Sequence, residues 1–229
     1  MSDLVLVLAV AHRDARQELR SRAVTVATVF FSGITVVILS FALGPDPDDL
    51  RRAAPGILWV ALAFAGVISA AQSYQNELAE GAFEQLLISP IPRAAIYIGK
   101  LLANWLTMFL LGLLTLAAIV ILFDLPLGRG GPLLAATLAA GTLGFSLIAT
   151  FYAALTANLR ARESLLPVLM FPVVVPVLLA AVRATETLLG PGQAAGDPAL
   201  AGPWLQLLVG FDLAYFVVCT AIFHFVVEE

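Results

Sequence analysis

The stretch "AVTVATVFFSGITVVILSFAL", residues 23–43, decides the fold because it is apolar along its length and carries no charged side chain. A helix needs about 20 apolar residues to cross the hydrocarbon core of a bilayer. Five further segments of similar character follow, at residues 53–72, 101–123, 133–157, 164–182 and 204–227. Spanning segments must satisfy their backbone internally, and runs of this length do so as helices. The sequence therefore predicts an all-α integral membrane protein with six transmembrane helices.

The composition agrees with this fold class and excludes a soluble globular domain. Of the 229 residues, 61% are hydrophobic and 12% are charged, whereas soluble domains carry about 25% charged residues. The formal net charge of −4 is small, which argues against nucleic acid as a partner. The single cysteine, Cys219, excludes an internal disulfide bond.

The arginines and the one lysine are distributed unevenly between the two sides of the predicted bundle. Eight lie before the first span or in the loops after the second and fourth: Arg13, Arg16, Arg20, Arg22, Arg93, Lys100, Arg160 and Arg162. Four lie on the opposite side: Arg51, Arg52, Arg129 and Arg183. Because loops rich in Lys and Arg stay in the cytoplasm, we expect both termini there. The opposite loops, at residues 44–53, 124–132 and 186–203, are rich in Gly, Pro and Asp and predict irregular turns.

The stretch "ELAEGAFEQLLISPIPR", residues 77–93, lies between the second and third spans. On a helix its acidic and its apolar side chains occupy opposite halves. Asn76 can cap the start of such a helix, and Pro90 and Pro92 end it. We therefore expect a short surface helix over residues 76–89, called the coupling segment below. It could simply shape the loop, but its acidic face favours a docking surface for a cytosolic partner, since interfacial anchors normally carry Lys and Arg.

The N-terminal stretch, residues 1–22, predicts a second amphipathic element. Its apolar run, residues 4–11, is too short to span a bilayer. Glu18 and Arg22 have the i, i+4 spacing of a helical ion pair. We expect an amphipathic elbow helix along the inner leaflet. Its arginines could make specific contacts or could act only as a positive-inside signal.

The chain carries none of the motifs that would make it an enzyme. A phosphate-binding loop would need G-x-x-x-x-G-K-[ST], but around Gly99 and Lys100 the sequence has Ala94 and Leu101 at the other two key positions. No Cys/His cluster has metal-site spacing, and no G-x-S-x-G occurs. His12 and His224 lie far apart and near the cytoplasmic side. We therefore expect no catalytic residue and no metal site.

Ionisable residues within spans are functional candidates by default. Asp212 is the clearest, about 12 Å below Trp204 at 1.5 Å per residue. It could alternatively be structural and pair with Arg183, near the outer end of the fifth span.

The fourth span places Ala140, Gly141, Gly144 and Ser146 on a small-residue face. Such a face permits close helix packing, which we favour over a pore lining, and it offers one possible dimer contact. Pro167, Pro172 and Pro176 predict a bend in the fifth span.

Several stretches resemble a known family. The pattern E-x-x-E-G-x-F-E-Q-L-L-x-S-P followed by "PRAAIYIGK" resembles the coupling helix in the first cytoplasmic loop of ABC-2-type permeases, which seats in a cleft of the ATPase subunit. More specifically, the chain resembles the CcmB family of cytochrome c maturation permeases. The resemblance also rests on "AHRDARQELRSR", on residues 141–185 and on "WLQLLVGFDLAYFVV", so it covers most of the chain in order.

The resemblance implies one ABC-2-type transmembrane domain over residues 1–229, in the bacterial inner membrane, without an ATPase site of its own. It implies the partners CcmA (the ATPase), CcmC and CcmD (membrane subunits) and CcmE (the haem chaperone). ATP would bind the partner, the complex would handle haem, and this chain would bind no cofactor. The residues implied in ATPase coupling are Glu77, Glu80, Gly81, Phe83, Glu84, Leu87, Pro90 and Arg93. Because ABC ATPases work as dimers, we expect two copies of the chain per complex.

Two alternatives stay open at this point. The chain could be an ABC-2 permease for another cargo, such as a lipid, a glycan or a drug. It could also be a membrane scaffold that transports nothing and holds a haem-handling complex together. Haem normally takes axial His, Met, Cys or Tyr ligands, and no histidine lies on the outer half. We therefore interpret the chain as the subunit that transmits movement within the complex, and we expect another subunit to hold the haem.

Overall fold

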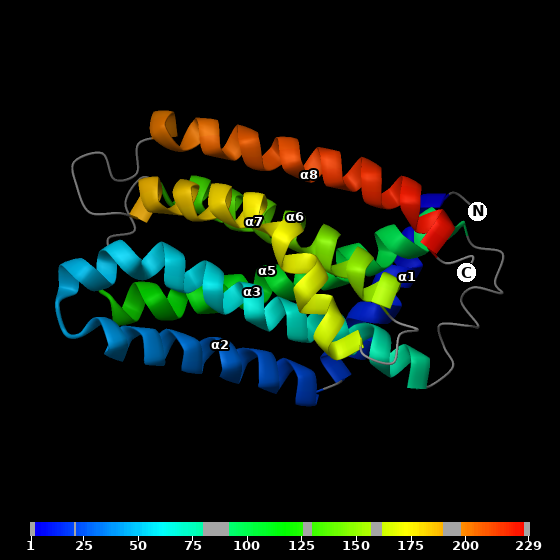
Figure 1. The fold of residues 1–229 in the computed structure, drawn as a ribbon, viewed down its shortest axis with the longest axis horizontal. Coiled ribbons are helices and arrows are strands. Elements are labelled where there is room, and N and C mark those ends of the chain that lie inside the picture. The colour runs from blue at the N-terminus through cyan, green and yellow to red at the C-terminus, as the bar shows by residue number, and fades with distance from the viewer. Residues whose placement is uncertain are drawn as a thin grey trace.

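A computed structural model describes residues 3–20, 22–79, 92–125, 130–156, 162–189 and 198–226 of the chain. Within these residues every regular secondary-structure element is an α-helix (Figure 1). The helices are α1 (Asp3–Arg20), α2 (Arg22–Leu43), α3 (Pro47–Ala79), α5 (Arg93–Leu122), α6 (Gly131–Thr156), α7 (Arg162–Leu189) and α8 (Pro198–Val226). Six of them, α2, α3 and α5 to α8, are long and apolar enough to cross a membrane. The predicted fold class is therefore confirmed, with α1 as the additional N-terminal helix.

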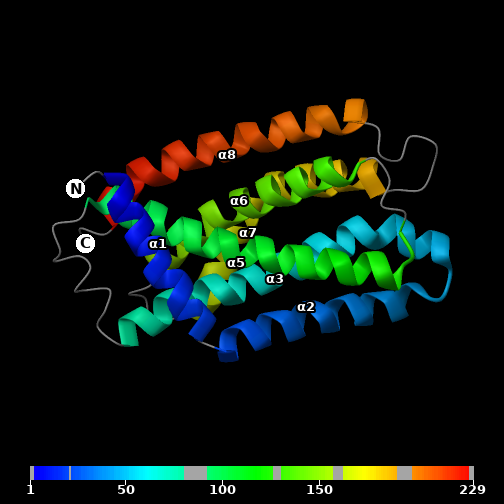
Figure 2. The same cartoon turned by 180° about the vertical axis from the view of Figure 1, so that it is seen from behind.

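The six spans lie side by side, and α2 and α8 form opposite edges of the bundle (Figure 1). In α3, 72% of the most apolar window is buried inside the protein, but in α2 and α8 the share is 17%. The exposed faces of the two edge helices are apolar, as expected for helices in contact with lipid. Seen from behind, α1 crosses the start of α5 (Figure 2). The start of α1 and the end of α8 lie at the same end of the bundle.

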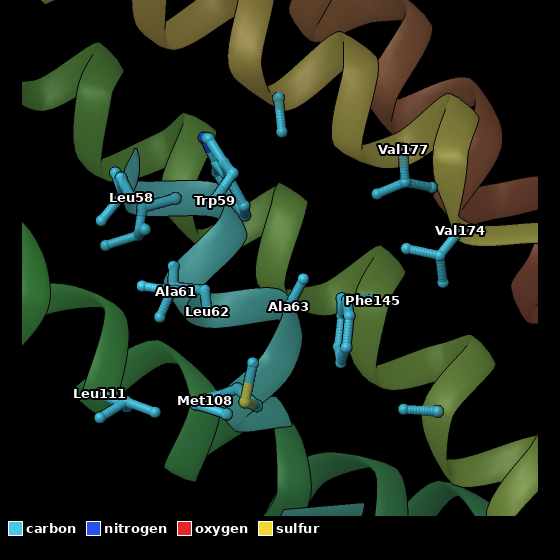
Figure 3. Close-up of a cluster of buried hydrophobic side chains, with 14 of the residues drawn as sticks. Leu58, Trp59, Ala61, Leu62, Ala63, Met108, Leu111, Phe145, Val174 and Val177 are labelled. Carbon is cyan, nitrogen blue, oxygen red and sulfur yellow. The ribbon is translucent and has the colours of Figure 1, made fainter. Parts of the chain in front are cut away.

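The core is centred on α3, which packs against α5, α6 and α7. Figure 3 shows Leu58, Trp59 and Leu62 of α3 among side chains of the neighbouring helices, such as Met108 of α5 and Phe145 of α6. Lipid is as apolar as these side chains, so close packing and interhelical hydrogen bonds hold the helices together. One such bond joins the edge helix α2 to α5, where Ser32 Oγ lies 2.8 Å from Thr115 Oγ1.

The connection between α2 and α3 is shorter than the irregular loop expected over residues 44–53. Helix α3 already begins at Pro47, and the backbone N–H of Asp48 donates to Asp46 Oδ1 at 2.9 Å. Asp46 is thus the N-cap, Pro47 has a φ suited to the first helical position, and the acidic first turn complements the helix dipole. Likewise, residues 186–189 and 198–203 of the third outer loop are helical, as parts of α7 and α8.

Helix α7 runs without interruption through Pro167, Pro172 and Pro176. A proline inside a helix lacks an N–H, and in membranes neighbouring helices can supply replacement donors. The carbonyl oxygen that Pro176 leaves without an intrahelical donor is that of Pro172, four residues earlier. The hydroxyl of Tyr215 on α8 donates to the neighbouring carbonyl oxygen, that of Val173, at 2.9 Å and joins α8 to α7 there. Because α7 is continuous, the prolines do not divide the fifth span.

Candidate functional site

The junction between α1 and α5 is the first part of the candidate site. Val7 and Val10 are buried on one face of α1, whereas Leu4 and Leu8 on the other face are exposed, which is the pattern of an amphipathic helix. At Gly99 of α5, an added Cβ would lie 2.6 Å from Val10 Cβ and 3.0 Å from the carbonyl oxygen of Val7. Only glycine therefore permits α1 to approach α5 so closely.

A buried ion pair joins α1 and α5 beside this close contact. Lys100 Nζ lies 3.2 Å from Asp14 Oδ2, and Arg13 Nη2 lies 2.9 Å from Asp14 Oδ1. The side chains of Lys100 and Asp14 are only 2% and 8% exposed. Because burying an unpaired charge is costly, these two charges depend on one another and hold α1 against α5.

Sequence reasoning missed this ion pair. It counted Lys100 among the positive-inside residues, rejected it as the lysine of a phosphate-binding loop, and gave Asp14 no role. A signal was present, since the only lysine of the chain follows Gly99 and Asp14 is an acidic residue between Arg13 and Arg16. The partners lie 86 residues apart in the chain, so their pairing depends on how the helices pack.

The coupling segment, residues 76–89, begins within the last turn of α3 and precedes α5 in the chain. The backbone of α3 continues through residues 76–79, so Asn76 does not start a new helix, and Glu77 lies in the last turn of α3. Arg93 is the first residue of α5, and the N–H groups of Ala95 and Ile96 bond to the carbonyl oxygen of Pro92. The other expected coupling residues lie outside the described residues: Glu80, Gly81, Phe83, Glu84, Leu87 and Pro90.

The first half of α5 is also fastened to α6 and α8. The Tyr97 hydroxyl donates to the carbonyl oxygen of Leu147 at 2.9 Å, and Asn104 Nδ2 donates to Thr150 Oγ1 at 3.0 Å. The Tyr97 ring contacts that of Phe223 on α8, with centroids 5.0 Å apart. Lys100 lies seven residues after Arg93, about 10 Å along the helix. All of these attachments therefore lie within the turns that follow the coupling segment.

Asp212 lies in the middle of the α8 span, Ala199–Phe223. Its side chain is buried against α6, because a Cβ added to Gly144 would contact Asp212 Oδ1 and also the side chain of Val177 on α7. Asp212 Oδ1 has no hydrogen-bond partner among the described residues. Arg183, the partner considered in the sequence analysis, forms an exposed ion pair with Glu186 at 2.9 Å instead.

The small residues of α6 lie against other helices of the same chain. A Cβ added to Gly141 would contact the ring of Trp59 on α3, and Trp59 Nε1 donates to Thr185 Oγ1 of α7 at 2.9 Å. Ala140 is partly buried, and Ser146 is fully buried. Since Gly141 and Gly144 are covered by α3, α7 and α8, these two glycines do not offer the dimer contact that the sequence suggested.

No group of three or more His, Cys, Asp or Glu side chains that could hold a metal ion occurs within the described ranges. One long helix, α5, begins directly after the coupling segment and is bound to α1, α6 and α8 within its first turns.

The sequence of the chain is similar to that of known proteins of one family. The profile of the family described as "CcmB protein" matches residues 5–228. "Heme exporter protein B" of Paracoccus denitrificans is 31% identical over 202 residues, which cover 88% of this chain and 90% of that protein. Proteins of the same name from Pseudomonas aeruginosa and Rhodobacter capsulatus are 32% and 33% identical over 73% and 75% of this chain, and over 74% and 78% of their own lengths.

Proposed function

Because the chain belongs to the CcmB family, we propose that it is the membrane-spanning permease subunit of an ABC complex that exports haem for cytochrome c maturation. The observation that carries this proposal is the family match over residues 5–228, together with relatives named heme exporter protein B. In this proposal the chain hydrolyses no ATP. The ATPase subunit CcmA binds ATP, CcmC and CcmD complete the membrane part, and haem passes to the chaperone CcmE.

We propose that α5 transmits the movement of the ATPase. When the ATPase dimer closes, it pushes on the coupling segment, and α5 is the helix that begins directly after that segment. Asp14, Tyr97 and Asn104 attach the first turns of α5 to α1 and α6. A push on the coupling segment therefore moves α5, α1 and the adjoining part of α6 together. Bound side chains transmit such movement because packed interfaces change between discrete arrangements instead of deforming smoothly.

Reconstitution of the complex tests this proposal. The chain is co-expressed with CcmA, CcmC and CcmD, purified, and its subunits are counted by native mass spectrometry. We expect two copies of this chain beside two ATPases, because closed two-fold symmetry is the commonest arrangement and each ATPase needs a coupling element. In vesicles that contain the complex, the rate of ATP hydrolysis should rise when haem and CcmE are added. One copy of the chain beside two ATPases would contradict the expected stoichiometry. ATP hydrolysis that does not respond to haem and CcmE would contradict the proposed function and favour a scaffold or another cargo.

The orientation of the bundle is a separate prediction. The start of α1 and the end of α8 lie at one end, and we expect that end in the cytoplasm because eight of the twelve Lys and Arg residues belong to that side. In a Cys219→Ala background, Ser89→Cys should react with an impermeant maleimide only in inside-out vesicles. Gln193→Cys should react only in intact spheroplasts. Reaction with the two sides exchanged would contradict the predicted topology.

A further inference from the structure

A groove of about 370 Å³ lies between the end of α2, the start of α3 and the end of α5. Its walls include Val37, Ser40 and Phe41 of α2, Leu50 of α3, and Leu122 and Phe123 at the end of α5. By volume it is as large as many small-molecule pockets. This groove, called the α2–α3–α5 groove below, lies at the opposite end of the bundle from α1 and from the start of α5.

The α2–α3–α5 groove opens on the lipid-facing side of the bundle. Phe41 at its edge is 83% exposed, and Leu122 is also exposed. Helix α2, which forms one wall, has the largely uncovered surface of an edge helix. Hydrocarbon from the bilayer therefore has direct access to the groove.

The groove walls offer few hydrogen-bond partners to a water molecule. The only polar side chain among the residues named above is Ser40, and its hydroxyl donates to the carbonyl oxygen of Val36 in its own helix at 2.6 Å. An ordered water needs two to four polar partners. The groove therefore suits an apolar chain better than water.

Charges of both signs lie at the polar rim of the groove. Arg51 follows the wall residue Leu50, and its Nη2 lies 3.2 Å from the carbonyl oxygen and 3.5 Å from Oδ2 of Asp124, which follows Phe123. The Arg51 side chain is 32% exposed, so part of its guanidinium group is accessible from outside the protein. Arg52 lies 3.8 Å from Asp49. The residues next to the groove walls thus present guanidinium donors beside several carboxylates.

We propose that the α2–α3–α5 groove binds one phospholipid of the surrounding bilayer with a zwitterionic aminoethyl headgroup, phosphatidylethanolamine. One acyl chain fills the apolar groove, the phosphate accepts a hydrogen bond from Arg51, and the ammonium group faces the carboxylates of Asp49 and Asp124. A purely anionic headgroup fits less well, because it would meet Asp46, Asp48, Asp49 and Asp124 as well as the two arginines. A choline headgroup has no N–H to donate to those carboxylates.

Native mass spectrometry of the purified full-length chain tests this proposal. Delipidated protein is mixed with equal amounts of phosphatidylethanolamine, phosphatidylcholine and phosphatidylglycerol in detergent. We expect one phosphatidylethanolamine per chain, retained in preference to the other two lipids.

Two variants with matched controls locate the bound lipid. Val37→Trp places a large side chain in the groove and should abolish lipid retention, whereas Val218→Trp, on the exposed face of α8, should not. Arg51→Met should lower retention about tenfold, as expected for loss of one charge-assisted hydrogen bond. Arg183→Met removes an exposed arginine of the same predicted membrane side and should leave retention unchanged.

The proposal is overturned if Val37→Trp and Arg51→Met retain as much lipid as the unaltered chain. It is also overturned if phosphatidylglycerol or phosphatidylcholine displaces phosphatidylethanolamine. A Val37→Trp chain that changes the number of protein copies per particle, with lipid retention unaltered, would identify the groove as a protein contact. None of these outcomes depends on haem or on the ATPase, so this test is independent of the proposed function.

Discussion

Replacing Lys100 by methionine is expected to weaken the attachment of α1 to α5 and to lower the free energy of unfolding by about 3 kcal/mol, as is typical when one partner of a buried ion pair is removed. Methionine fills a similar volume, so the main change is that Asp14 loses the partner on its Oδ2 side. Arg13 still contacts Asp14 Oδ1, which places the expected loss at the low end of the usual range. The measurement is unfolding in mixed micelles, with proteolysis of α1 as a local readout.

A double replacement separates the charge effect from a packing effect. The double replacement Lys100→Met with Asp14→Leu removes both charges of this pair, and such apolar replacements are often neutral or stabilising. Most of the lost stability should therefore return. The matched control is Arg183→Met, which breaks the exposed pair with Glu186 and should change stability by less than about 1 kcal/mol. If Lys100→Met unfolds like the unaltered chain, the ion pair does not hold α1 in place.

The second large effect is expected for Glu80→Lys combined with Glu84→Lys. Both residues lie on the acidic half of the amphipathic sequence pattern, so the chain should still be expressed and inserted. Association with the ATPase should be lost, because each reversal replaces attraction with like-charge repulsion, which can cost several kcal/mol at an interface. Co-purification of the ATPase with the membrane chain measures the effect.

Two controls accompany this variant. Glu228→Lys with Glu229→Lys makes the same change in net charge at the C-terminus, on the same predicted side of the membrane, and should leave the ATPase bound. Leu86→Asp, on the apolar half of the pattern, should instead disturb the seating of the coupling segment on its own membrane domain. A double lysine variant that retains its full complement of ATPase and supports normal cytochrome c assembly would rule out docking by the acidic half.

The number and order of the spans could be predicted because each needs about 20 apolar residues, and hydropathy records that requirement directly. The ends of the helices could not be predicted from hydropathy, which reports membrane thickness. The second span was expected to end at Gln72, where polar residues begin, yet α3 continues to Ala79 because no Gly or Pro interrupts residues 72–79. At the other end, Asp46 and Pro47 were assigned to a loop, although Asp followed by Pro is also a helix-start signal.

For the candidate site, the sequence likewise revealed single residues but did not reveal their contacts. Asp212 could be found from the sequence because a carboxylate in an apolar run is conspicuous, and Gly144 because small residues permit close packing. Their contact with one another could not be predicted, since it depends on how α8 packs against α6. The ion pair of Lys100 with Asp14 was missed for a related reason. Each of these two residues belongs to a polar segment where charge is ordinary, and only the packing of α1 on α5 makes them buried.

The position of Asp212 also bears on how the chain is made. The ribosome completes α8 last, after α6 and α7 have been synthesised. An aspartate at the centre of a lone helix costs about 3 kcal/mol to pass from the translocon into lipid, because hydrocarbon gives the carboxylate no partner. Packing against Gly144 of α6 removes that side chain from lipid. Helices inserted earlier therefore favour release of the last helix into the bilayer, because they offer its aspartate a place away from lipid.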